Sequence, residues 1–275
     1  MKILGRSPRR IVSIFWQLPN LFVASYRCFV LFHRPVEVLW SYVRRQNPPT
    51  HRVALRDGLV IQLSMDNSDI VTMFLIFCRY DYGKITPGSV VVDIGANIGV
   101  FALYAAREGA KIVQAYEPAE ESFDLLQRNI ENNGFGKIIF PHRAAVVGKS
   151  SPPVWFPRRS NVFNAIDTGS ENNSDHELVP TIPFADLVSN IPESNMFKLD
   201  CEGGEYDIIL NSEDSVFDRI EEIRLEYHRG PHQQLFARFE KLGFFRRQFM
   251  DDGKGGGYLW LTRCTSVEKS NLLRN

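Results

Sequence analysis

The chain has 275 residues, of which 44% are hydrophobic and 23% are charged, and its formal net charge is zero. These values exclude a disordered or collagen-like chain and a small disulfide scaffold, so we expect one large domain with a packed core and at most a modest extension. The cysteines lie too far apart for a CxxC pair or a zinc-ligand cluster, which predicts no metal site and isolated thiols in a reducing, cytoplasmic compartment: Cys28, Cys78, Cys201 and Cys264.

The zero net charge hides an asymmetry along the chain. Residues 1–56 contain ten Lys or Arg and one acid, whereas residues 57–275 contain twenty-two bases and thirty-one acids, so the two parts carry +9 and −9. A basic stretch of this kind binds nucleic acid, anionic lipid or the acidic remainder of its own chain, and charge alone does not choose between them.

The amino end is both basic and apolar. Residues 11–32 are largely apolar, but Gln17, Pro19 and Arg27 interrupt them, so we do not expect a membrane-spanning helix. No Ala-x-Ala cleavage site follows, which disfavours secretion. We expect residues 1–46 to form a helix pair that either packs on the rest of the chain or makes a peripheral contact with an anionic membrane. Packing is the commoner use of an apolar helix face.

Turn residues divide the rest of the chain. The sequence Asn-Pro-Pro at 47–49 breaks the first segment, and alternating apolar residues around Asp57-Gly58 predict a hairpin, followed by an apolar helix over 69–80. We expect four parts: a helical extension (1–49), a hairpin and helix leading into the core (50–86), the catalytic domain (87–264) and a C-terminal tail (265–275).

A strand and a glycine turn begin the catalytic domain. Residues 89–94 form a β-branched run typical of a strand buried in a parallel sheet, and residues 100–108 have the composition of a helix. The turn between them lies where the free N–H groups of a helix start can hold an anion. The candidate cofactor-binding residues of this segment are Asp93, Gly95, Ala96, Asn97 and Gly99. Asn97 and Val100 replace the second and third glycines of a dinucleotide fingerprint, which argues against a nicotinamide cofactor.

The next strands supply further cofactor candidates. Strand 112–116 ends in Glu117, twenty-two residues after Gly95, where a carboxylate can accept hydrogen bonds from ribose hydroxyls. After a helix ending near residues 132–134, a third strand begins at 138–140, and we expect the backbone near Ala144 to lie beside an adenine edge. This β-α-β-α order predicts a doubly wound α/β sheet.

A second cluster of polar residues follows strand 195–199. It contains Asp200, Glu202 and Glu205, and His228 ends a further strand over 222–228. Asp200 or Glu202 can act as a general base, and so can His228 as a neutral imidazole; the sequence leaves this choice open. Glu205 falls in the first turn of the next helix, where we expect a structural role.

Two further segments complete the expected domain. Residues 150–179 are rich in Ser, Asn and Pro and predict a long loop that helps to select the substrate. A helix over 233–242 and two strands, the second over 258–262, are expected to close the sheet.

Four motifs together resemble the FkbM family of S-adenosylmethionine-dependent methyltransferases, over about residues 87–249. They are Asp-Ile-Gly-Ala-Asn-Ile-Gly at 93–99, Tyr-Glu-Pro at 116–118, Lys-Leu-Asp-Cys-Glu-Gly-Gly-Glu at 198–205 and Leu-Glu-Tyr-His at 225–228. The resemblance implies a Rossmann-like, mostly parallel seven-stranded sheet and methylation of a hydroxyl on a sugar, polyketide or lipid-linked acceptor. One departure is Ala185-Asp186, where the family usually has two adjacent acids.

The resemblance also implies a role for each candidate residue. S-adenosyl-L-methionine is the implied cofactor, with no metal required, and a small-molecule or glycan hydroxyl is the implied partner, with no nucleic acid. The glycine turn and Asp93 would hold the methionyl end, Glu117 the ribose and Ala144 the adenine side, while Asp200, Glu202 and His228 would face the acceptor. Two alternatives stay open: an NAD-dependent oxidoreductase on the same sheet, and a non-catalytic membrane-surface adaptor.

Overall fold

The structure is a computed structural model that describes residues 8–65, 69–158, 176–191, 195–251 and 255–263. The chain divides into two compact units, residues 1–83 and 84–275. The boundaries of the four expected parts remain predictions.

The first unit contains the expected helix pair, hairpin and apolar helix. Its elements are α1 (Pro8–Leu31), α2 (Pro35–Arg44), the antiparallel strands β1 (Arg52–Ala54) and β2 (Val60–Gln62), α3 (Asp69–Phe74) and the π-helix η1 (Leu75–Arg79). Aromatic rings join the helices, because Tyr42 stacks on Phe74 and Phe32 meets Phe77 edge to face. Among the helices of the described residues, none combines the length and hydropathy needed to cross a membrane.

The second unit is built on a seven-stranded sheet, in the order β12-β13-β11-β10-β3-β4-β5. The five strands from β11 to β5 are parallel, and β13 is antiparallel to both β11 and β12. The strands are β3 (Val90–Ile94), β4 (Ile112–Tyr116), β5 (Ile139–His142), β10 (Asn195–Leu199), β11 (Glu222–Tyr227), β12 (Phe244–Asp251) and β13 (Gly257–Arg263). The prediction of a mostly parallel seven-stranded sheet is therefore confirmed.

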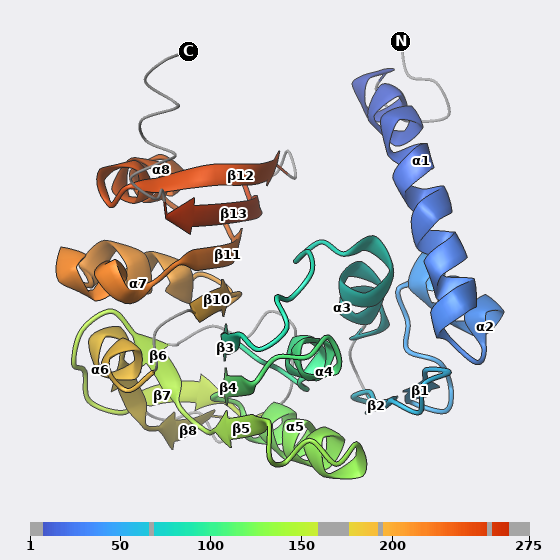
Figure 1. Cartoon of the computed structure of the whole chain (residues 1–275), viewed down its shortest axis with the longest axis horizontal. Coiled ribbons are helices and arrows are strands. Elements are labelled where there is room, and N and C mark those ends of the chain that lie inside the picture. The colour runs from blue at the N-terminus through green and yellow to red at the C-terminus, as the bar shows by residue number, and fades with distance from the viewer. Residues whose placement is uncertain (1–7, 66–68, 159–175, 192–194, 252–254, 264–275) are drawn as a thin grey trace. The chain divides into compact units, whose positions relative to one another are not determined.

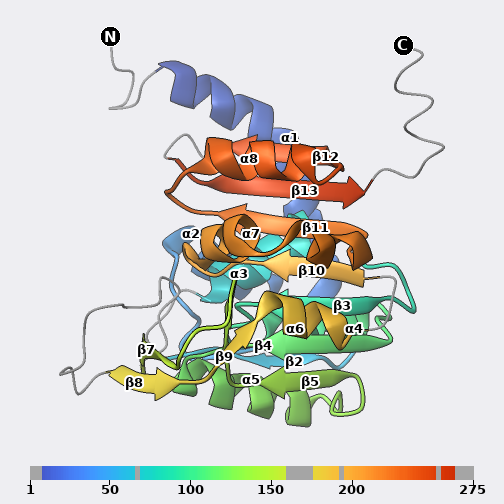
Figure 2. The ribbon, with the colours of Figure 1, turned by 90° about the vertical axis from the view of Figure 1, so that its left-hand side faces the viewer.

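Helices cover both faces of this sheet, as a doubly wound fold requires. Helices α4 and α5 lie on one face, and α6, α7 and α8 lie on the other (Figure 1); Figure 2 looks onto the face that α6, α7 and α8 cover. The helices are α4 (Val100–Arg107), α5 (Glu120–Asn132), α6 (Phe184–Ser189), α7 (Gly204–Asn211) and α8 (His232–Lys241), with a 3₁₀ helix, η2 (Asp214–Arg219), after α7.

The strand order fixes where a ligand can bind. The chain runs outward from β3 to β4 and β5, then returns to place β10 on the other side of β3. Ligands of open α/β sheets bind at such a reversal, beyond the carboxyl ends of the strands. All five residues of β3 are buried. The polar turn that follows β3 is therefore the first segment after the strand that a ligand can contact.

The prediction of one long loop over residues 150–179 is wrong for the described part of that segment. Strands β7 (Val154–Pro157) and β8 (His176–Val179) pair there in antiparallel fashion, while residues 159–175 lie outside the described residues. Phe156 and Val179 become buried together with Ala119, and this apolar contact explains why the two ends pair. A smaller parallel pair joins β6 (Ala145–Val147) to β9 (Thr181–Pro183).

Candidate active site

The glycine turn after β3 is held against two neighbouring strands. The N–H groups of Gly95 and Ala96 both donate to the carbonyl of Tyr116, at 3.0 and 2.9 Å. Gly95 has a φ of +77°, and a Cβ built on it would lie 1.9 Å from the backbone oxygen of Asp200. Only glycine fits this close approach, so the turn seals one wall of the strand exit.

Glu117 connects this turn to the start of α5. One carboxylate oxygen accepts a hydrogen bond from the N–H of Asn97 at 2.8 Å, and the other accepts one from the N–H of Ala119 at 2.9 Å. Burial raises the pKa of Glu117 to about 7, although these hydrogen bonds act in the opposite direction. The carboxylate is therefore fixed in position, and each oxygen keeps a lone pair for a further donor.

A cleft opens beside Glu117 at the carboxyl ends of β3, β4 and β10. The space inside it that the centre of a water molecule can reach is about 90 Å³. Tyr116, Val146 and Phe156 give it apolar walls. Six of the residues selected from the sequence line it: Gly95, Asn97, Glu117, Ala144, Asp200 and Glu202.

The other cofactor candidates lie around the cleft and are not among its lining residues. Gly99 has a φ of +88° at the start of α4, and a Cβ there would lie 2.5 Å from Leu126. Ala96 is buried.

Ala144 lines the cleft, but its N–H already donates to the carbonyl of His142 at 3.1 Å. Ala144 therefore offers the cleft its apolar side chain rather than a free donor.

Asp93 lies beneath the cleft, where it pairs with Lys198. The Nζ of Lys198 lies 3.0 Å from an Asp93 oxygen and donates to the carbonyl of Gly95 at 2.7 Å. Burial lowers the pKa of Lys198, but the charges of Asp93 and Asp200 outweigh that effect and raise it. This buried ion pair ties β10 to β3 and supports the glycine turn from below. Lys198 belongs to the motif at 198–205, but the motif alone does not indicate its role.

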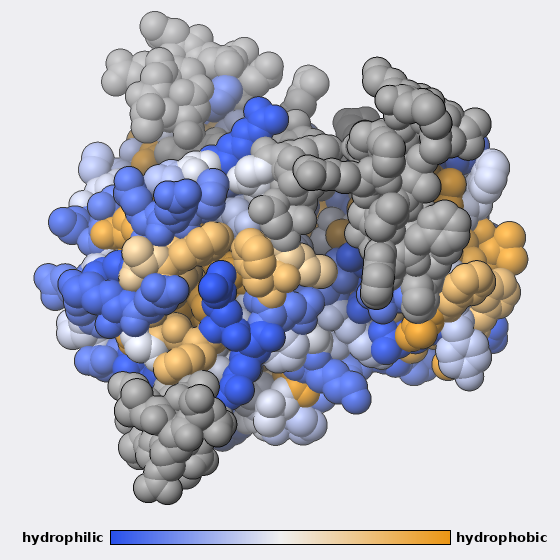
Figure 3. Space-filling model, turned by 90° about the horizontal axis from the view of Figure 1, so that it is seen from above, coloured by the Kyte–Doolittle hydropathy of each residue, from blue (hydrophilic) through white to orange (hydrophobic). Residues whose placement is uncertain are grey.

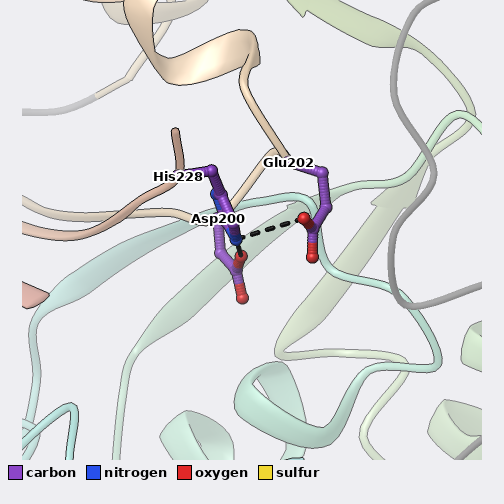
Figure 4. Close-up of side chains that lie close together, drawn as sticks. All are labelled: Asp200, Glu202 and His228. Carbon is purple, nitrogen blue, oxygen red and sulfur yellow. Dashed lines mark ion pairs between the residues drawn. The ribbon is translucent and has the colours of Figure 1, made fainter. Parts of the chain in front are cut away.

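Asp200, Glu202 and His228 come together where β10 and β11 end (Figure 4). The Nε2 atom of His228 lies 3.2 Å from a Glu202 oxygen and 3.9 Å from an Asp200 oxygen. Glu202 has a φ of +51°, which is uncommon for a residue other than glycine and is a form of backbone strain found at functional sites. The expected cluster is thus present, with its side chains facing one another.

His228 is held in place by the first turn of α7. One Glu205 oxygen accepts hydrogen bonds from the backbone N–H of His228 at 2.8 Å and from Nδ1 at 3.2 Å. The Tyr206 hydroxyl donates to the carbonyl of His228 at 2.5 Å. Glu205 is fully buried, so the residue expected to be structural acts by orienting the imidazole.

The cluster changes the protonation of its members. Burial lowers the pKa of His228, but the hydrogen bond to Glu205 and the charges of Asp200 and Glu202 outweigh it and raise the pKa to about 9. Burial, opposed by the charge of His228, raises the pKa of Glu202 to about 7. At neutral pH the ring is an imidazolium, which differs from the neutral imidazole considered from the sequence. A carboxyl group with a pKa near 7 is suited to general base chemistry.

The same three side chains also lie close enough together to hold a metal ion, which would require the neutral form of His228, because an imidazolium has no free lone pair. Asp200, Glu202 and His228 each offer one ligand atom, and these atoms lie within 4.8 Å of one another in the described part of the chain. Cysteine spacing had predicted no metal site. This cluster of oxygen and nitrogen donors involves no cysteine and could not be found by that criterion.

The similarity of this chain to a known protein family covers the region that contains these residues. Residues 93–252 match the family described as "Methyltransferase FkbM domain". "Methyltransferase 1" of Beauveria bassiana is 26% identical over 170 residues, which cover 54% of this chain and 68% of that protein. "31-O-demethyl-FK506 methyltransferase FkbM" of Streptomyces tacrolimicus is 44% identical over 54 residues, or 19% of this chain and 21% of that protein, so the match spans about a fifth of its length.

The chain also resembles solved structures. A ribosomal protein L11 methylase from Lactobacillus delbrueckii subsp. bulgaricus aligns with 80% of this chain and 85% of its own, with a TM-score of 0.44 and 13% identity.

Proposed function

Because this chain belongs to the FkbM-domain methyltransferase family, which uses S-adenosylmethionine, we propose that it transfers a methyl group to a hydroxyl oxygen of a sugar, polyketide or lipid-linked acceptor. The observation that carries this proposal is the position of Asp200 and Glu202. Both line the cleft that Gly95, Asn97 and Glu117 also line. The same cleft therefore contains residues suited to bind a nucleoside and a group that can accept a proton.

The residues of the cleft suit the cofactor. S-adenosylmethionine supplies, when bound, an electrophilic methyl group on a positively charged sulfur. Gly95 and Asn97 line the cleft with the turn, the Glu117 carboxylate can accept from ribose hydroxyls, and Ala144 provides an apolar contact for a base. The carboxylates around the cleft favour a cation electrostatically. Asp93 would act on the methionyl end through Lys198 and the turn rather than by direct contact.

Glu202 is the residue that we assign as the general base. Its pKa of about 7 lets it be ionised and still basic near neutral pH, whereas His228, with a pKa of about 9, already carries its proton. In this assignment the imidazolium, held by Glu205, orients the Glu202 carboxylate at 3.2 Å. Asp200 supplies further negative charge, 3.9 Å from the same Nε2 atom.

The class of acceptor rests on two observations. The relative from Streptomyces tacrolimicus is named for 31-O-demethyl-FK506, an acceptor whose name marks a missing O-methyl group. Tyr116, Val146 and Phe156 provide apolar surface beside the polar cluster, which suits an acceptor with an apolar body and a hydroxyl group. Phe156 belongs to β7, so this part of segment 150–179 keeps its proposed role in acceptor selection.

The alternatives have less support. A nicotinamide-dependent oxidoreductase would lack the usual glycine pattern at Asn97 and Val100, and the family match is to methyltransferases. A non-catalytic adaptor would not need a base candidate with a pKa near 7 beside the cleft.

Isotope transfer tests the proposal. The full-length protein is incubated with methyl-labelled S-adenosylmethionine and fractions of a cell extract, and labelled products are identified by mass spectrometry and NMR. We expect an O-methyl ether in the product, and a loss of labelling with Glu202→Gln. Label on nitrogen or carbon, or equal labelling by Glu202→Gln, would overturn the assignment. Glu131→Ala, an exposed change on α5, is the matched control.

A further inference from the structure

Helix α1 presents an apolar strip to solvent. Phe22, Tyr26 and Phe29 recur at spacings of four and three residues, so they share one side of the helix, and they are 73%, 70% and 50% exposed. The opposite side, with Ala24 and Cys28, is fully buried in the first unit. The helix is therefore apolar both where it packs and where it does not, unlike an ordinary surface helix.

Helix α2 repeats this arrangement. Val36, Trp40 and Val43 recur at the same spacings and are 68%, 62% and 70% exposed, while Val38 and Ser41 are buried on another side. Apolar side chains at i, i+4 and i+7 on an exposed side form a continuous strip and not a scatter of single residues.

Exposed apolar side chains concentrate on these two helices. Of the fourteen large hydrophobic residues exposed in the described chain, nine lie on α1 and α2. Orange side chains gather at the right-hand edge of the face in Figure 3, on this part of the chain. We call the nine the α1–α2 apolar face: Leu21, Phe22, Val23, Tyr26, Phe29, Val30, Val36, Trp40 and Val43.

Exposed arginines lie at both ends of α2, and one of them, Arg34, pairs with Glu37 at 3.6 Å. Arg34, Arg44 and Arg45 are exposed, and the Arg44 guanidinium lies 5.9 Å from the centre of the Trp40 ring. Residues 1–56 hold ten bases and one acid. A protein partner of ordinary composition gives no reason for such a one-sided charge, whereas an anionic lipid surface attracts it.

We propose that the α1–α2 apolar face lies in the headgroup region of a membrane that carries anionic phospholipids. Phe22, Tyr26 and Trp40 then occupy the interface, where aromatic rings are favoured, and the arginines meet lipid phosphates. The buried sides of both helices remain packed on the first unit, so the contact is peripheral. It also brings the protein to the surface where a lipid-linked hydroxyl would be found.

Vesicle flotation tests this proposal on the full chain. Vesicles of phosphatidylcholine mixed with phosphatidylglycerol are compared with vesicles of phosphatidylcholine alone. We expect the protein to float with the mixed vesicles and to be released as salt is raised. The triple change Phe22→Ser, Tyr26→Ser and Trp40→Ser should weaken vesicle binding by more than about tenfold, because it removes interfacial apolar area.

Two controls make the result specific. Met65→Ser and Leu178→Ser change side chains that are 74% and 55% exposed but lie outside the apolar face, and they should leave flotation unchanged. Arg44→Glu with Arg45→Glu should weaken binding to mixed vesicles only. Circular dichroism and binding of S-adenosylhomocysteine show that each variant is folded.

Three outcomes would overturn the proposal. One is no flotation of the full chain with either vesicle. Another is flotation that the triple change leaves intact. The third is a concentration-dependent dimer, seen by sedimentation, that the triple change abolishes while vesicle binding persists, because a second copy of the chain would then cover the apolar face.

Discussion

At the scale of single residues, the surroundings of Gly95 leave no space for any side chain. Its missing side chain lets the turn after β3 approach the backbone of Asp200, which follows β10, with no space for a methyl group. Glu117 is fixed equally closely, because both of its carboxylate oxygens accept backbone hydrogen bonds. Two substitutions separate this local fit from general effects on folding.

We predict that Gly95→Ala is more destabilising than Gly134→Ala. Both glycines have positive φ values, +77° and +68°, but a Cβ at Gly134 meets no atom within 4 Å. The strain of the backbone conformation is thus shared, and only Gly95→Ala adds a steric overlap, which costs about 1–3 kcal/mol. Urea denaturation of both variants measures the difference. Equal losses of unfolding free energy would show that the turn can move away from Asp200.

We predict that Glu117→Ala weakens binding of S-adenosylhomocysteine by at least about tenfold. Hydrogen bonds to a charged group contribute roughly 1.5–3 kcal/mol, and about 1.4 kcal/mol corresponds to a factor of ten. The change also leaves the N–H of Asn97 without its acceptor at 2.8 Å. Isothermal titration calorimetry gives the affinity, with Glu131→Ala as the control. Unchanged affinity would remove the ribose role of Glu117.

At the scale of elements, the site depends on where two strands and one helix end. Strand β10 delivers Asp200 and Glu202, strand β11 delivers His228, and the first turn of α7 provides Glu205. Because β10 and β11 are parallel neighbours, their carboxyl ends meet at one edge of the sheet. Glu205 from α7, together with Asp200 and Glu202, raises the pKa of the His228 ring.

We predict that Glu205→Gln lowers the pKa of His228 by about 1–3 pH units. The substitution keeps the size of the side chain but removes the negative charge 3.2 Å from Nδ1, and a close opposite charge has effects of this size. An NMR titration of the His228 ring measures the pKa. Glu213→Gln, which changes an exposed carboxylate, should leave it unaltered. A pKa that stays near 9 in Glu205→Gln would assign the effect to Asp200 and Glu202 instead.

We predict that kcat rises as pH rises through about 7. Below that value Glu202 is protonated and cannot accept the acceptor proton; above it, the carboxylate is free. Glu202→Gln should lower kcat by about 10² to 10⁴ and abolish this pH dependence. Glu226→Gln, a change at a nearby carboxyl group, should retain it. The charged groups that act on Glu202 include His228, Asp200, Glu205 and Lys198, and Glu226 also interacts with it electrostatically.

The sequence was sufficient for the central strands and for most of the cleft. The β-branched run of β3 and the glycine turn have local signatures, and parallel strands bring Glu117, Asp200 and Glu202 to one edge. Strands β7 and β8 were missed because their pairing joins segments about twenty residues apart within a polar region. The protonation of His228 could not be predicted, because it depends on its distance from Glu205 on another element.

At the scale of the whole molecule, the chain separates a unit with an apolar basic surface from a unit with an acidic cleft. Residues 1–83 carry a formal charge of +6 (11 bases, 5 acids) and residues 84–275 carry −6 (21 bases, 27 acids), which is consistent with two tasks, membrane contact and methyl transfer, of which the first is our proposal. Because each unit contains a cysteine, ligand binding in the cleft can be followed by the reactivity of one thiol, with the other thiol as an internal control. Cys78 is buried in the first unit, and Cys201 lines the cleft in the second.

We predict that S-adenosylhomocysteine slows alkylation of Cys201 and leaves that of Cys78 unchanged. Burial raises the pKa of the Cys201 thiol, and hydrogen bonding with Cys28 together with burial raises that of Cys78, so both react slowly in the folded protein. A ligand in the cleft adds cover only at Cys201. Mass spectrometry of peptides from iodoacetamide-treated protein, with Cys264→Ser as background, measures both rates. Equal slowing at both thiols would point to a global effect instead.

The hydrogen bond from Lys198 to the carbonyl of Gly95 spans 103 residues of sequence. A nascent polypeptide that has emerged only as far as Glu117 contains the glycine turn and the ribose carboxylate, yet lacks the lysine that supports them. Such distant partners make assembly slow, because loop closure precedes any gain from the contact. We therefore expect that a nascent chain on the ribosome cannot bind the nucleoside until β10 has been translated and has paired with β3.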